Sequence, residues 1–119
     1  MSGGFAFKVS YNYNGGTMKV IIKATNLELT GPLKVYIEEK MDDLDKYLQS
    51  LEQSSIQVRI EVARASNHHR HGEDVYHVDA NLDLPGEVLR AEEDSDDARA
   101  AIDAVKDKLK REIEKYKTK

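Results

Sequence analysis

The cations of the C-terminal segment are the residues of this sequence that most clearly suggest chemistry. Lys108, Arg111 and Lys115 are separated by three and four residues, so they share one face of a helix. A row of cations on a helix can follow the phosphates of a nucleic acid and release condensed counterions. The same spacing is typical of a solvated surface helix with internal ion pairs, and periodicity alone favours that interpretation. The pairs expected in that case are Asp107–Arg111, Glu112–Lys115 and Glu114–Lys117.

A histidine cluster comes next, with His68, His69, Arg70 and His71 in sequence and His77 beyond. Clustered imidazoles can bind zinc or nickel. Neighbouring histidines in a flexible loop rarely close a tetrahedral site, and the chain has no cysteine to complete one. We interpret the segment as an exposed hairpin tip and predict no metal; contact of this loop with a phosphate or a base edge is the alternative.

The acidic residues between positions 79 and 97 have no catalytic or metal-binding spacing. Asp79, Asp83 and the run from Glu92 to Asp97 lack the pattern of an EF-hand. No serine stands in a nucleophile elbow, and no glycine-rich phosphate loop follows a strand. We interpret these carboxylates as a solvated face. The prediction is a protein that is not an enzyme, with no cofactor and no small-molecule substrate.

Charge is unevenly distributed along the chain of 119 residues, a length that suits one domain. The net charge is -4, but residues 99–119 carry eight positive and four negative side chains. The preceding 98 residues carry ten and eighteen, so the asymmetry indicates a localised electrostatic footprint. No apolar run approaches the roughly 18 residues of a membrane span. That and the missing cysteine predict a cytoplasmic protein without a membrane partner.

The N-terminal segment alternates strictly between apolar and small or polar residues. The alternating set is Phe5, Phe7, Val9, Tyr11 and Tyr13. Alternation predicts a strand, and the following Asn14-Gly15-Gly16 is hairpin-turn chemistry. We therefore expect an edge strand beside a second strand from Met18 to Thr25. Residues 1–17 are interpreted first as an added leader, with a native extra strand as the alternative.

The remaining elements follow from periodicity. Thr30 and Pro32 predict a helix start, and one apolar stripe predicts a single continuous helix. That stripe consists of Leu33, Ile37, Met41, Leu44, Leu48 and Leu51. Alternation predicts strands over residues 56–63 and 76–84 and a short strand over 88–92. Ser95 is the expected N-cap of a second helix, whose apolar stripe leaves Lys106, Lys110 and Lys117 on the flank opposite Lys108.

The order of elements from Met18 is therefore β-α-β-β-β-α. A β-α-β start requires a parallel first pair, and the hairpins after it are antiparallel. The predicted fold is α+β, with two helices packed on one face of a mixed four-stranded sheet and an extra N-terminal edge strand. The other face of the sheet is expected to be polar.

Two stretches in this order resemble the ribosome hibernation-promoting factors, also called protein Y or sigma-54 modulation proteins. They are LELTGPLKVYIEEKMDDLDKYL, from Leu27 to Leu48, and SDDARAAIDAVKDKLKREIEKYK, from Ser95 to Lys117. The resemblance implies a fold like double-stranded-RNA-binding domains, in a ribosome-binding domain over residues 18–119. It implies binding to the small ribosomal subunit across the decoding region, which silences translation and preserves idle ribosomes in stress or stationary phase. Because the chain ends at Lys119, the resemblance is to the short form.

The resemblance also implies rRNA-binding residues. The positions that match basic positions of the family are Lys23, Lys34, Lys40, Lys108, Arg111, Lys115 and Lys117. The sequence departs from the family at Asp43, where relatives often carry lysine, and in the acidic run from Glu92 to Asp97. The aromatic N-terminal strand has no counterpart in the family. The alternative function is a protein-interaction module that uses this strand for homodimerisation or β-augmentation.

Overall fold

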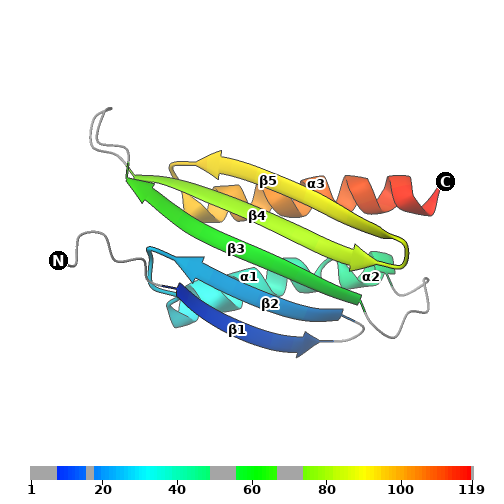
Figure 1. Cartoon of the computed structure of the whole chain (residues 1–119), viewed down its shortest axis with the longest axis horizontal. Coiled ribbons are helices and arrows are strands. Elements are labelled where there is room, and N and C mark those ends of the chain that lie inside the picture. Colours follow the sequence, from blue (N-terminus) through cyan, green and yellow to red (C-terminus); the bar gives the residue numbers. More distant parts are fainter. Residues whose placement is uncertain (1–7, 16–17, 49–55, 67–73, 119) are drawn as a thin grey trace.

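The computed structural model describes residues 8–15, 18–48, 56–66 and 74–118. They form one five-stranded sheet covered by helices on one face, as Figure 1 shows. The strands lie in chain order across the sheet: β1 (Lys8–Gly15), β2 (Met18–Thr25), β3 (Ile56–Ser66), β4 (Asp74–Leu84) and β5 (Glu87–Ser95). The helices are α1 (Gly31–Asp42), α2 (Asp45–Leu48) and α3 (Ala98–Lys117). The α+β fold predicted from the sequence is confirmed.

Strand pairing follows the predicted topology. β2 and β3 are parallel and are connected through α1 and α2, whereas the pairs β3–β4 and β4–β5 are antiparallel. β1 pairs antiparallel with β2 over its whole length, from Lys8 opposite Thr25 to Gly15 opposite Met18. The predicted N-terminal edge strand is therefore confirmed over residues 8–15, whereas Phe5 and Phe7 of the alternating set lie outside the described residues. The turn between β4 and β5 contains Gly86, whose φ of 77° lies in the left-handed region that glycine adopts without strain.

The core lies between the sheet and the helix layer. Alternate residues of β2 to β5 and the apolar stripes of the helices are buried there, including Val20, Ile60, Ile102 and Leu109. Because side chains alternate across a strand, the intervening polar residues lie on the opposite face of the sheet, which no described element covers. The two faces of the molecule therefore differ: one consists of helices and the other is an open sheet.

The first helix is not continuous, contrary to the prediction. α1 ends at Asp42, and the next turn uses the tighter bonds Leu44 N–H to Met41 O and Tyr47 N–H to Leu44 O, both 3.0 Å. Aspartate at a helix C-terminus opposes the helix dipole, which favours a break here. Leu44, within the break, and Leu48, after it, both remain buried. Residues 49–55, which include the expected Leu51, lie outside the described residues.

The boundary between β5 and α3 also differs from the prediction. β5 extends to Ser95, which pairs with Tyr76 of β4, so the strand is longer than the expected 88–92. The N-cap is therefore Asp97 rather than Ser95, and its carboxylate accepts a hydrogen bond from Arg99 N–H at 3.1 Å. Ser95 supports the cap by accepting from Asp97 N–H, also at 3.1 Å. No helix in the described part of the chain is long and apolar enough to cross a membrane.

Candidate nucleic-acid interface

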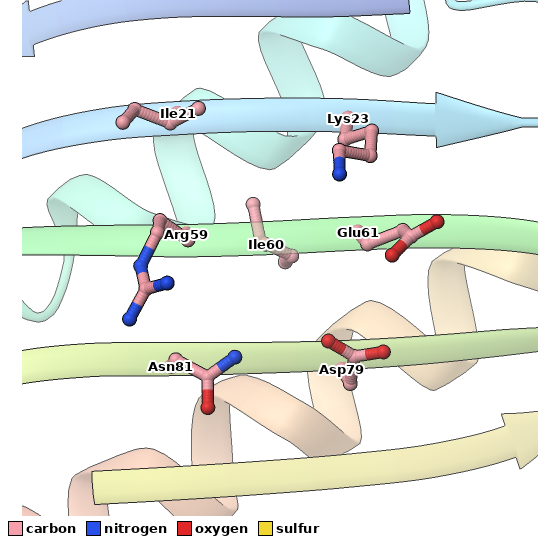
Figure 2. Close-up of a pocket in the computed structure, with 7 residues that line it drawn as sticks. All are labelled: Ile21, Lys23, Arg59, Ile60, Glu61, Asp79 and Asn81. Carbon is pink, nitrogen blue, oxygen red and sulfur yellow. The ribbon is translucent and has the colours of Figure 1, made fainter. Parts of the chain in front are cut away.

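Lys23 lies on the open sheet face, away from the other predicted RNA-binding residues, which are all on helices. It lines a pocket of about 240 Å³ together with Ile21, Arg59, Ile60, Glu61, Asp79 and Asn81 (Figure 2). Glu61 is the Cα partner of Lys23 on β3, and Asp79 is the partner of Glu61 on β4. A phosphate approaching Lys23 would therefore meet two carboxylates.

The acidic row across the open face continues onto β5. Glu61 faces Asp79, and Asp79 faces Glu92, so three carboxylates stand opposite one another across three strands. Like charges directly opposite each other destabilise a sheet. Burial, and then the carboxylate of Glu61, raise the pKa of Asp79. The open face near these residues is therefore an unfavourable surface for a polyanion.

His77 lies within the same acidic region. Its Nδ1 atom contacts a carboxylate oxygen of Asp94, and its Nε2 atom lies 3.4 Å from Glu92 and 3.6 Å from Asp79. The hydrogen bond to Asp94, with the nearby negative charges, raises the pKa of His77 above 6.5. The other histidines of the predicted cluster lie outside the described residues. Among the residues that the structure describes, no group of three or more His, Asp or Glu could hold a metal ion.

Lys108 points from α3 to the edge of the sheet. Its Nζ atom donates to Oε1 of Glu93 at 2.6 Å and to the backbone carbonyl of Glu92 at 2.8 Å. Glu93 neutralises the charge of Lys108, and the second bond satisfies a carbonyl of the edge strand β5. Lys108 is therefore placed to join α3 to β5, which sequence spacing could not indicate.

Arg111 and Lys115 extend into solvent on α3. The side chain of Lys115 is 74% exposed, with its Nζ atom 3.5 Å from Glu112. Arg111 is exposed and forms no ion pair with any described residue. Of the three ion pairs expected for a solvated helix, only Glu112–Lys115 forms among the described residues. Surface pairs of this kind contribute little stability, so both cations can reach a polyanion.

The opposite flank of α3 faces α1 and α2. Lys106 Nζ lies 3.2 Å from Asp43, Lys40 of α1 lies 3.5 Å from Asp103, and Lys117 Nζ donates to the Tyr47 carbonyl at 2.9 Å. We call this surface, between α1–α2 and α3, the helix seam. It contains the predicted residues Lys40 and Lys117, whereas Lys34 lies in the first turns of α1 and is half-buried.

Two tyrosines of the helix seam were not singled out by the sequence. Tyr36 has Lys40 Nζ 5.2 Å and Arg99 Cζ 4.7 Å from its ring centroid. Its hydroxyl donates to Oδ1 of Asp103 at 2.6 Å. That hydrogen bond and burial raise the pKa of Tyr36 to about 12.

The second tyrosine has the same arrangement of cations. Tyr47 has Lys46 Nζ at 5.5 Å and Lys110 Nζ at 5.3 Å from its ring centroid. The i, i+4 spacing of Tyr36 and Lys40 could have indicated the first contact. The contacts to α3 depend on how the helices pack, so no sequence signal indicates them.

Comparison with known proteins identifies the family. The family model described as sigma 54 modulation protein / S30EA ribosomal protein matches residues 20–119. The chain is 35% identical over 98 residues to a ribosome hibernation promotion factor of Deinococcus radiodurans, which covers 82% of this chain and 48% of that protein. It is 33% identical over 102 residues to one of Lactococcus lactis, covering 86% of this chain and 51% of that protein. The chain thus spans about half the length of these curated relatives.

Solved structures agree with this match. The N-terminal domain of Thermus thermophilus Protein Y is 28% identical with a TM-score of 0.59, covering 82% of this chain and 93% of that one. A ribosomal subunit interface protein from Coxiella burnetii shares the fold at 24% identity and a TM-score of 0.59, covering 86% and 98%. The chain therefore belongs to the sigma 54 modulation protein / S30EA ribosomal protein family.

Proposed function

We propose that this protein binds the small ribosomal subunit at the decoding region and blocks access of mRNA and tRNA. Bound there in the cytoplasm, it silences translation and preserves idle ribosomes under stress. It acts by occupying the site and not by chemistry. Its cations fix its position on rRNA phosphates, and the shape of the RNA selects the site. The relatives are named ribosome hibernation promotion factors, which supports the proposal.

One structural observation supports RNA binding most directly: α3 carries seven cations and four carboxylates, whereas the row across the open sheet face is acidic. The helix layer gathers cations at the helix seam and on the exposed side of α3, whereas the open sheet face carries Glu61, Asp79, Glu92 and Asp94. An RNA surface would attract the first face and repel the second near its acidic row. The proposed binding face is therefore the helix layer, with Arg111 and Lys115 at its exposed side.

The test is sedimentation with purified small ribosomal subunits over a series of salt concentrations. We expect the double variant Arg111→Gln, Lys115→Gln to bind small subunits more weakly. The slope of log affinity against log salt concentration should become smaller by about two, because each lost phosphate contact contributes roughly one to that slope. The control is Lys19→Gln combined with Arg90→Gln, which removes the same charge from exposed positions on the open sheet face. Equal binding by both double variants would contradict the proposed interface.

Lys23 and Lys108 need separate tests, because both were predicted RNA-binding residues and both have acidic neighbours. We expect Lys23→Gln to bind as the native protein does.

A competition assay tests the blocking step: the protein should reduce binding of initiator tRNA and mRNA to small subunits. Unchanged initiator tRNA binding at saturating protein would exclude the decoding region.

A second candidate function comes from the position of β1. Its backbone pairs with β2 on one side only, and no described strand lies on its other side. An edge strand of this kind can add a strand from a second copy or from another protein. Deletion of residues 1–17 tests this function. The interaction module is favoured if the native protein is a dimer, the deletion variant is a monomer, and neither of them binds ribosomes.

A further inference from the structure

Three lysines from two helices converge on Tyr47, at the end of the helix seam where α2 meets α3. Lys46 and Lys110 place their Nζ atoms 5.5 Å and 5.3 Å from the centroid of its ring. Lys117 donates to the Tyr47 backbone carbonyl at 2.9 Å. We call these four residues the Tyr47 cluster. Only Lys117 among them matched a basic position of the family.

A tyrosine ring holds a cation differently from a carboxylate. The face of the ring attracts an ammonium group through its quadrupole, but the ring has no net charge. A lysine over the ring therefore keeps its full positive charge. Lys106 and Lys108, in contrast, are held by Asp43 and Glu93, which cancel theirs.

The ring itself is fixed by the core. Tyr47 is half-buried and packs against the hydrophobic core, between the fully buried Leu44 and Leu48. Lys46 and Lys117 are exposed, and Lys110 is half-buried along α3. The cluster thus combines a rigid centre with ammonium groups that reach solvent, which lowers the entropy lost when they bind an anion.

We propose that the Tyr47 cluster binds a backbone phosphate of RNA, with Tyr47 as the positioning residue. This inference rests on the proposed function and names a contact within it. Phosphate fits because its oxygens accept hydrogen bonds from several ammonium donors at once. An RNA strand fits because the cluster continues along the helix seam to a second group of cations, Lys40 and Arg99 at Tyr36.

The experiment compares variants of Tyr47 in binding to small ribosomal subunits. Tyr47→Phe keeps the ring, so we expect native affinity; Tyr47→Leu removes the ring, and we expect binding about three- to tenfold weaker. Lys110→Gln should weaken binding and reduce the slope of log affinity against log salt concentration by about one, the contribution of one phosphate contact. Native affinity of Tyr47→Phe would show that the hydroxyl is not needed, and the comparison with a second tyrosine-to-leucine variant separates the loss of the ring from a loss of packing.

Tyr116→Leu is the matched control. Tyr116 also packs partly buried against the core, its hydroxyl donates to the Pro85 carbonyl at 3.0 Å, and no described cation lies over its ring. Melting curves of both leucine variants report any loss of fold. Native binding by Tyr47→Leu, or equal weakening by Tyr47→Leu and Tyr116→Leu, would overturn the positioning role.

Two further outcomes separate this inference from the proposed function. If the native protein does not sediment with small subunits, the proposed function fails. If native binding responds to Lys110→Gln but not to Tyr47→Leu, only the inference fails. A titration with inorganic phosphate distinguishes free phosphate from RNA as the ligand. If Tyr47→Leu weakens the binding of inorganic phosphate but leaves the binding of small subunits unchanged, the cluster is not an RNA site.

Discussion

Lys108 and Glu93 form the contact that joins α3 to the edge strand β5, with 2.6 Å between Nζ and Oε1. The same Nζ atom satisfies the backbone carbonyl of Glu92. Both side chains are about a third or more exposed, at 44% and 34%. Solvent therefore screens the pair, and its contribution to stability is modest.

Substitution of Lys108 should affect stability more than RNA binding. We expect Lys108→Gln to lower the free energy of unfolding by up to about 1 kcal/mol, measured by urea denaturation. Its affinity for small subunits should change less than that of Arg111→Gln, because Glu93 already neutralises Lys108. If both variants lose the same affinity and the same salt dependence, Lys108 contacts RNA directly.

Asp43 should weaken RNA binding in the native protein. It holds Lys106 at 3.2 Å in the helix seam, so Asp43→Asn releases a positive charge there. We expect small-subunit binding about two- to fivefold tighter at low salt, with the gain lost at high salt through screening. Glu28→Gln, an exposed position in the connector before α1, makes the same change in net charge and serves as the control. An equal gain in both variants would indicate a net-charge effect alone.

His77 should stabilise the fold most at low pH. Its pKa is raised above 6.5, mainly by the hydrogen bond to Asp94, so protonated His77 favours the folded state. This contribution is fully present below pH 6.5 and is lost as pH rises through the folded-state pKa. An NMR titration of the His77 ring should give a raised pKa that falls in Asp94→Asn. The prediction fails if the two titration curves coincide.

Tyr36 should titrate after ordinary tyrosines. Its pKa of about 12, against 10.0 for a free side chain, arises first from the hydrogen bond to Asp103. The resulting stabilisation is present below pH 10.0 and is lost as pH rises through about 12. Ultraviolet absorbance of tyrosinate should show one late component that disappears in Tyr36→Phe and shifts to lower pH in Asp103→Asn. Persistence of that component in Tyr36→Phe would assign it to another tyrosine.

Local sequence patterns predicted most of the fold, because they depend on few residues. Alternation in β2, with Val20 and Ile22 buried and Lys19 and Lys23 exposed, follows from the geometry of a single strand. The edge position of β1 followed from its alternation and from the turn residues after it. The break at Asp43 was missed because the apolar stripe continues through it, and the N-cap was missed because strand pairing extends β5 to Ser95.

The sequence by itself determined the α+β order, the family and the concentration of cations in α3. Only the tertiary structure decided which cations keep an unneutralised charge. Lys108, Lys110 and Arg111 are neighbours on one helix, yet one meets Glu93, one lies over Tyr47 and one extends into solvent. The physical reason is that helical periodicity sets the direction of each side chain, whereas the group that it meets comes from a distant part of the chain.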